Sequence, residues 1–213
     1  MAMDLNRVNR NEILHYLGMH GAAPDERTAA VIEECLRELN TKVAPKHVFR
    51  TFPLHVSLPE EDEAPLLDLG CFTLRSRDLA RNLKGCHEVL LFAATIGEGA
   101  DFLIRRYEKT QMSRAVILQA AAAAMIEAYC NEINDAWKEE YAAKGCALHP
   151  RYSCGYGDFA LEYQKEFMRV LEMEKRLGIR LTDGLLMVPT KSVTAVIGIR
   201  SGERTVRGTD DAV

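Results

Sequence analysis

Paired cysteines are missing from the sequence, although its 213 residues include six cysteines. None of them forms a CxxC or other paired spacing, so the sequence contains neither a common zinc pattern nor a disulfide framework. Scattered thiols of this kind are typical of buried side chains in a reducing compartment. Cys146, His149 and Cys154 could be drawn as metal ligands, but their spacing fits no common zinc site and no fourth ligand is near in sequence. We therefore predict buried thiols and no metal site.

A polybasic run and a long apolar run are also missing. The formal net charge is −4, and without a basic patch the chain lacks the electrostatic footprint of a nucleic-acid-binding protein. The most apolar run, residues 89–94, is far too short to cross a bilayer. The first residues are polar and lack the apolar stretch of a signal peptide. We expect a cytoplasmic protein that binds neither nucleic acid nor membranes.

The sequence also lacks a recognisable catalytic constellation. Its serines are not set in a nucleophile elbow, and its six histidines form no paired pattern. Two glycine-rich turns, residues 95–100 and 155–160, resemble phosphate loops. The first places Glu98 where a pyrophosphate would lie, and the second follows no buried strand. We predict no catalytic residue, and only Asp158 and Asp183 remain as plausible acids or bases for an unrelated small-molecule enzyme.

What is present is the composition of an ordinary globular protein, with 47% hydrophobic and 27% charged residues. Apolar spacing and capping residues predict helices over residues 9–17, from residue 26 onward, and over 77–83, 99–107, 113–143 and 161–177. Strands are predicted over residues 46–56 (an edge strand interrupted at Pro53), 66–74, 86–95 (the best central strand), 179–182 and 192–199. Because strands and helices show little βαβ alternation, we predict an α+β fold with a largely antiparallel sheet. We expect one domain over residues 1–213, with a polar tail after about residue 201.

The sequence Arg-Tyr-Ser-Cys-Gly-Tyr-Gly-Asp, which begins at Arg151, has the residues that a small-molecule site needs. Its glycines leave backbone N–H and C=O groups uncovered. Arg151 can hold a carboxylate through paired donors, and the face of Tyr152 or Tyr156 can accommodate an ammonium or sulfonium group. Backbone groups around Ser153 and Gly155 could hydrogen-bond an adenine. The segment therefore predicts a site for a ligand that carries both a carboxylate and a cation.

A set of motifs follows in order along the last third of the chain: Arg151-x-x-x-Gly155-Tyr156, a helix ending at Gly178, Leu181-Thr182-Asp183, and Met187-x-Pro189-x-x-Ser192-Val193. Together they resemble the activation (reactivation) domain of cobalamin-dependent methionine synthase. The chain upstream, especially residues 89–99 and the long helix after them, is similar to a free-standing version of that domain. The resemblance covers most of the chain and is strongest over residues 151–198.

This resemblance implies a single C-shaped α+β domain with a twisted antiparallel sheet that binds S-adenosylmethionine. In the family, cob(I)alamin is occasionally oxidised to inert cob(II)alamin. An electron from flavodoxin or a similar reductant, coupled to methyl transfer from S-adenosylmethionine, then restores methylcobalamin. The sequence has no Asp-x-His-x-x-Gly motif to hold cobalamin itself. The resemblance thus implies a reactivation protein in methionine biosynthesis. It would act on the cobalamin-binding module of a separate methionine synthase that lacks its own activation domain. The chain would then be a component of that enzyme's methyltransferase activity.

The resemblance also implies roles for four residues at matching positions. Arg151 would contact the methionine part of the ligand, and Ser153 would offer backbone groups. Gly155 would permit the turn, and Tyr156 would line the site. These four are the predicted S-adenosylmethionine-binding residues.

The chain departs from the family pattern at several positions. Gly145 stands where related enzymes can carry a glutamate, six positions before the motif arginine. Residues 157–159, Gly-Asp-Phe, replace a Pro-rich stretch, Val188 replaces a tryptophan, and the C-terminal extension is largely missing. These departures leave open an alternative, a ligand-free docking module that only steers the conformation of a cobalamin-binding partner.

Overall fold

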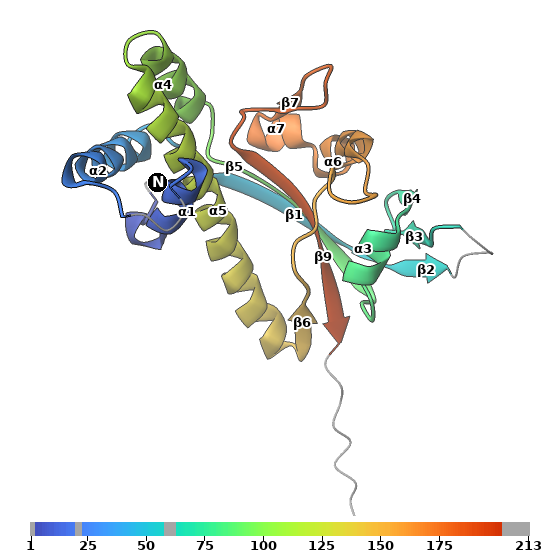
Figure 1. Cartoon of the computed structure of the whole chain (residues 1–213). Helices are drawn as coiled ribbons and strands as arrows, with labels where there is room; N and C mark the ends of the chain where they lie inside the picture. Colours follow the sequence, from blue (N-terminus) through green and yellow to red (C-terminus); the bar gives the residue numbers. More distant parts are fainter. Residues whose placement is uncertain (1–2, 20–22, 58–62, 202–213) are drawn as a thin grey trace, which may run out of the picture.

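The computed structural model describes residues 3–19, 23–57 and 63–201. Its central element is a four-stranded antiparallel sheet with the strand order β1-β5-β9-β6 (Figure 1). The strands span Lys46–Pro53 (β1), Glu88–Thr95 (β5), Cys146–Leu148 (β6) and Ser192–Ser201 (β9). Helices cover both faces of this sheet, which confirms the predicted α+β class with a largely antiparallel sheet. The positions of β5 at the centre and β1 at the edge are also as predicted.

The two inner strands are buried on both faces, which explains why their sequences are apolar without alternation. Successive side chains of a strand point to opposite faces of the sheet. Alternate residues of β5 therefore enter two separate cores: Leu90, Phe92 and Ala94 in one, and Val89, Leu91 and Ala93 in the other. The sheet thus separates two layers of helices.

The first core lies between the sheet and α1 (Arg10–Tyr16), α2 (Glu26–Asn40), α4 (Gly99–Glu108) and α5 (Met112–Ala143). The N-terminal ends of α1 and α2 are capped by the side chains of Asn9 and Asp25, in agreement with the predicted starts. The predicted apolar stripe of α5 is largely buried and includes Leu118, Met125 and Trp137. A short 3₁₀ turn, Leu5–Arg7, precedes α1.

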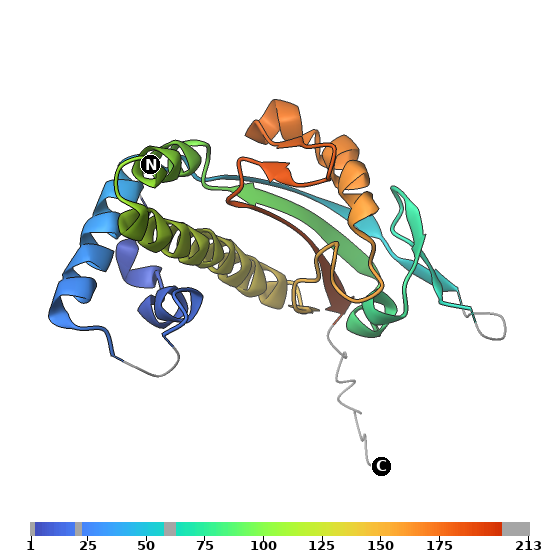
Figure 2. The ribbon, with the colours of Figure 1, turned by 45° about the horizontal axis from the view of Figure 1, so that its top comes forward.

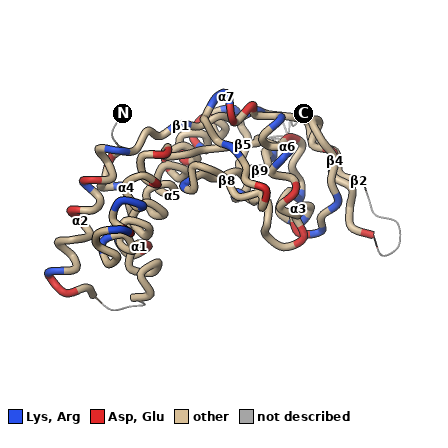
Figure 3. The backbone as a smooth tube through the Cα atoms, turned by 90° about the horizontal axis from the view of Figure 1, so that it is seen from above, with Lys and Arg blue, Asp and Glu red and all other residues tan. Residues whose placement is uncertain are grey.

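The second core lies on the opposite face of the sheet. It is covered by α3 (Arg77–Asn82), a 3₁₀ turn (Leu161–Tyr163), α6 (Gln164–Leu171) and α7 (Met173–Leu177). Two small antiparallel sheets complete the fold: β2-β3-β4 (His55–Ser57, Leu66–Asp68, Thr73–Arg75) and β7-β8 (Arg180–Leu181, Met187–Val188). The chain follows a curved outline from α1 and α2, over the central sheet, to the β2-β3-β4 sheet (Figures 2 and 3). This outline agrees with the expected C shape.

The predicted single strand over residues 66–74 is wrong, because β3 and β4 form a hairpin there. The Asp68 carboxylate accepts a hydrogen bond from the Gly70 N–H at 2.8 Å and closes the turn. Gly70 has a φ of +73°, and a Cβ at this position would lie 2.9 Å from Cδ of Pro53. The alternation of apolar residues continues through the turn, so it could not reveal the reversal.

The predicted helix over residues 161–177 is interrupted at Glu172, which has a φ of +50°. Leu171 and Met173 are both fully buried. In a continuous helix, residues two apart point about 200° away from each other, so only one of them could face the core. The break lets both enter the core, and the second helix then ends at Gly178 (φ +73°), as predicted. The segment after α5, predicted as irregular, contains the short strand β6.

Acidic and basic side chains are mixed along the described chain (Figure 3). Among the described helices, none combines the length and hydropathy that a membrane span requires. The predicted polar tail after Ser201 lies outside the described residues.

The packing predicts which thiols are inert. Cys35, Cys130 and Cys154 are buried, and burial raises the pKa of Cys35 to about 11 and those of Cys130 and Cys154 to about 12. We expect iodoacetamide at about pH 8 to leave these three cysteines unmodified in the folded protein, whereas the partly exposed Cys146 reacts. Mass spectrometry of the peptides measures the labelling, and urea-unfolded protein serves as the fully reactive control. Rapid labelling of Cys130 or Cys154 in the folded state would contradict this packing.

Candidate functional site

The segment that begins at Arg151 runs beside β9 in extended conformation. Tyr152 exchanges two backbone hydrogen bonds with Val196, at 2.9 and 2.8 Å. Because side chains alternate along an extended backbone, Arg151 and Ser153 point toward the α5 side, whereas Tyr152 and Cys154 pack into the second core. One pair of backbone hydrogen bonds therefore decides which side chains of the motif point toward α5.

The turn that follows is held by backbone and aromatic contacts. The Gly155 N–H donates to the Phe159 carbonyl at 2.7 Å. The fully buried Phe159 ring stacks on Tyr152, with 6.4 Å between ring centroids. Gly157 has a φ of +54°, and a Cβ there would lie 2.2 Å from Oδ2 of Asp78. Both glycines are thus required by geometry, the first for the turn and the second for close packing on α3.

Asp158 ties the same turn to the start of α3. Its carboxylate accepts hydrogen bonds from the Ser76 hydroxyl and from the backbone N–H groups of Arg77 (2.6 Å) and Asp78 (3.2 Å). Burial alone would raise the pKa of Asp158, but these hydrogen bonds lower it below its ordinary value. Asp158 is therefore a charged anchor of α3 and not a free acid or base. Asp183 lies exposed in the turn between β7 and β8.

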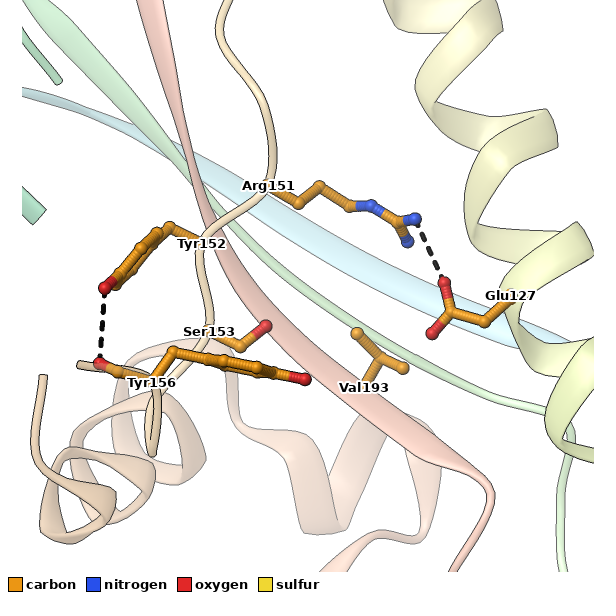
Figure 4. Close-up of a pocket in the computed structure, with 6 residues that line it drawn as sticks. All are labelled: Glu127, Arg151, Tyr152, Ser153, Tyr156 and Val193. Carbon is orange, nitrogen blue, oxygen red and sulfur yellow. Dashed lines mark hydrogen bonds and ion pairs between the residues drawn. The ribbon is translucent and has the colours of Figure 1, made fainter. Parts of the chain in front are cut away.

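Side chains from three elements meet in a pocket of about 260 Å³ (Figure 4). Its lining residues are Glu127 from α5, Arg151, Tyr152, Ser153 and Tyr156 from the segment beside β9, and Val193 from β9 itself. Three of the four predicted site residues, Arg151, Ser153 and Tyr156, therefore share one pocket. Gly155 is not part of the lining, but its φ of +90° forms the turn that presents Tyr156.

Arg151 reaches across the pocket to α5 (Figure 4). Its Nη2 lies 3.1 Å from Oε2 of Glu127 and donates a hydrogen bond to Oδ1 of Asn131 at 2.8 Å. Its Nη1 is buried and has no hydrogen-bond acceptor among the residues that the structure describes. An atom that is buried in this way does not face the open pocket, so a ligand acceptor would reach it only after neighbouring side chains move. The pocket thus offers one fixed cation and one carboxylate a few ångströms apart.

A second hollow of about 400 Å³ shares Arg151 with the pocket. Its lining residues are Asn131, Asn134, Lys138, Leu148, His149, Pro150 and Arg151. The hollow follows α5 toward its C-terminal end. Arg151 borders both cavities, and we call the two together the groove beside α5.

Cys146, His149 and Cys154 are not brought together as metal ligands. Cys154 is buried in the second core, and Nδ1 of His149 lies 2.6 Å from the Asn82 carbonyl oxygen. Within the described ranges, no group of three His, Cys, Asp or Glu residues could hold a metal ion.

Comparison with known families decides what kind of domain carries this pocket. Residues 78–204 match the family model of the activation domain of vitamin B12-dependent methionine synthase. The chain belongs to this family. The match includes every residue that lines the pocket and confirms the resemblance found in the sequence.

Among solved structures, the crystal structure of the MetH reactivation domain bound to AdoHcy is similar to this activation-domain fold. The two match with a TM-score of 0.61 over 91% of this chain and 74% of that chain, at 16% sequence identity. At this identity the likeness concerns the fold alone. No curated protein matches the sequence.

Two residues of α5 that accept hydrogen bonds from the motif arginine were not predicted from the sequence: Glu127 and Asn131. A signal was present, because Glu127 is the only charged residue between Ala115 and Cys130 in a mainly apolar stretch that is largely buried. A charge in such a position usually has a partner. The absent glutamate at Gly145 has a structural explanation, since Gly145 ends α5 with a φ of +72°. The carboxylate beside Arg151 comes from α5.

We expect Gly157→Ala to destabilise the protein more than Gly145→Ala. Both substitutions place a side chain at a positive φ, which costs roughly 1–2 kcal/mol. No atom lies within 4 Å of a Cβ at Gly145, whereas at Gly157 the Asp78 carboxylate must move away. Urea unfolding of the two variants measures the difference in the free energy of unfolding. Equal losses would show that the turn does not pack on α3 as closely as described.

We expect Asp158→Asn to lower the free energy of unfolding by about 1 kcal/mol near neutral pH, the usual contribution of a capping carboxylate. Because the pKa of Asp158 is lowered in the folded state, its contribution is complete above the ordinary carboxyl pKa of about 4. The contribution disappears as the pH falls through the lowered pKa. Urea titrations at several pH values should therefore show the variant and the wild type converging in acid. Asp183→Asn removes an exposed carboxylate and should have little effect at any pH.

Proposed function

We propose that this chain binds S-adenosylmethionine in the pocket between α5 and the Arg151 segment. In this proposal it supports reductive methylation of cob(II)alamin on a separate cobalamin-dependent methionine synthase. Family membership supports the class of reaction. The structurally similar MetH domain was crystallised with AdoHcy, which differs from S-adenosylmethionine by the sulfonium methyl group. The observation that carries the proposal is the Arg151–Glu127 ion pair at the pocket.

This ion pair matches the charges of an α-amino acid. Arg151, which lines the pocket, can hold the ligand's α-carboxylate through paired guanidinium donors. Glu127, whose side chain is 36% exposed, can turn to the α-ammonium group. On binding, Arg151 would exchange Glu127 for the ligand's carboxylate, and Glu127 would exchange Arg151 for the ligand's ammonium group. Since every charge remains paired, binding does not require an isolated charge to be buried.

Tyr156 is placed to contact the sulfonium end of the ligand. Its side chain is 68% exposed and its ring extends toward Val193 at the edge of the pocket (Figure 4). A cation is attracted to the face of an aromatic ring, and Val193 keeps that side of the pocket apolar. Because Tyr156 is at the surface, a methyl group held beside it stays accessible to a docked partner. Residues of this kind act by positioning, which needs no acid or base on the chain.

The remaining components would come from other proteins. S-adenosylmethionine supplies the methyl group as a cation, and flavodoxin or a similar reductant supplies the electron that converts cob(II)alamin to the methyl-accepting cob(I) state. The cobalamin-binding module of the partner would carry the cobalamin. We infer one activation domain over residues 1–213, acting in the cytoplasm.

We expect calorimetric titration with S-adenosylmethionine to show saturable binding that Arg151→Ala weakens by at least about tenfold. A hydrogen bond to a charged group contributes roughly 1.5–3 kcal/mol, and each 1.4 kcal/mol is about a factor of ten in affinity. Glu127→Gln keeps the side-chain size and removes the charge, and it should weaken binding by several-fold through loss of the ammonium contact.

Arg176→Ala is the matched control for these titrations. Arg176 lies in α7 and pairs with Glu172 at 2.8 Å, outside the pocket, so its loss removes the same charge without touching the site. Each titration is repeated in the presence of a cobalamin-loaded methionine synthase that lacks its own activation domain. Binding only in that mixture would indicate a site completed by the partner. No binding in either condition would exclude S-adenosylmethionine as the ligand and favour the ligand-free docking module.

A further inference from the structure

The guanidinium of Arg151 has two acceptors on α5 that differ in charge. Glu127 and Asn131 lie one helical turn apart, so their side chains are neighbours on the same face of α5. Both contact Nη2 of Arg151, with the neutral amide oxygen at 2.8 Å and the carboxylate oxygen at 3.1 Å. The arginine is therefore held in place by two acceptors, but only one of them opposes its charge.

We propose that Asn131 is a positioning residue that fixes the Arg151 guanidinium without neutralising it, and so makes the pocket selective for ligands with a free carboxylate. This inference rests on the proposed binding of S-adenosylmethionine.

The need for such a residue follows from the exchange of ion pairs on binding. When Glu127 turns to the ligand's ammonium group, it no longer restrains Arg151. Among the described contacts of Nη2, the hydrogen bond to Asn131 then remains. Because Asn131 lines the second hollow and is not among the residues that line the pocket, it can keep this contact while the ligand occupies the pocket. Asn131 thus holds the arginine from the second hollow, outside the pocket that the ligand would occupy.

The neutrality of Asn131 is as important as its position. An aspartate there would give Arg151 two carboxylates in the free protein, and a ligand carboxylate would be the third negative group around one cation. Like charges this close repel each other, so the affinity for an anionic ligand group would fall. A neutral amide orients the guanidinium through a hydrogen bond of normal length and leaves its charge to Glu127 and the ligand.

The test compares two ligands and three variants by calorimetry. The ligands are S-adenosylmethionine and decarboxylated S-adenosylmethionine, which keeps the sulfonium and the amine but has no carboxylate. Asn131→Asp retains the size of the side chain, and we expect it to weaken S-adenosylmethionine binding by about tenfold or more, equivalent to about 1.4 kcal/mol. Binding of the decarboxylated ligand should not weaken, since this ligand brings no carboxylate and an aspartate at position 131 would pair with Arg151 once Glu127 turns to the amine. Asn131→Ala should weaken S-adenosylmethionine binding by a few-fold, about the value of one net hydrogen bond.

Asn134→Asp is the matched control, because Asn134 lines the same second hollow and is not among the described hydrogen-bond partners of Arg151. It adds the same charge one turn further along α5 and should cost much less affinity than Asn131→Asp. Equal losses in the two aspartate variants would overturn the proposal, since they would reflect the general field of the groove. Equal losses for the two ligands would also overturn it, since they would indicate damage to the fold.

Two further results separate this inference from the proposed function. If wild-type protein binds S-adenosylmethionine and both Asn131 variants bind it equally well, only the role of Asn131 is overturned. If wild-type protein binds neither ligand, with or without the partner, both proposals are overturned. Thermal unfolding of each variant shows whether it is folded, and Asn131→Ala gives the answer if Asn131→Asp is not.

Discussion

The candidate site depends on the pairing between Tyr152 and Val196. These two backbone hydrogen bonds attach the motif segment to β9, the strand that is buried between two layers of helices. The alternation of an extended backbone then places Arg151 and Ser153 toward α5, and Tyr152 and Cys154 toward the second core. A shift of one residue in this pairing would exchange the two sides and bury the ligand-facing groups. The position of the arginine is therefore a property of the sheet register.

The turn after this segment shows how the chain can depart from the family sequence and still fix a loop. Where the family pattern has prolines, residues 157–159 are Gly-Asp-Phe. Proline would stiffen the backbone by restricting φ. Here the restraint comes from tertiary contacts: the Gly157 backbone packs on α3, the Asp158 carboxylate anchors the start of that helix, and Phe159 is buried against Tyr152. In this chain the turn is therefore restrained by its contacts with the second core, and not by the restricted φ of prolines.

Much of the fold could be predicted because local signals and burial agree. The apolar run of β5 and the predicted starts of α1, α2 and α3 lie close to the observed elements. The hairpin after Asp68 and the break at Glu172 were not predicted, since each is stabilised by contacts that sequence periodicity does not contain.

The site residues were likewise only partly predictable from the sequence. Arg151, Ser153 and Tyr156 are close in sequence and were found together, whereas Glu127 and Asn131 are 24 and 20 residues from the arginine and meet it only through the packing of α5.

The reach of Arg151 across the groove also has a mechanical consequence. In the structure this side chain is a cross-link between α5 and the segment on β9, two parts of the chain that otherwise border a cavity. A ligand that takes the arginine at one end and Glu127 at the other does not remove this cross-link but lengthens it and becomes its middle part. The bound ligand would then connect α5 to the segment on β9. When the ligand leaves after losing its methyl group, the restraint between these two parts of the chain would change. A partner protein that contacts both parts would be affected by that change directly.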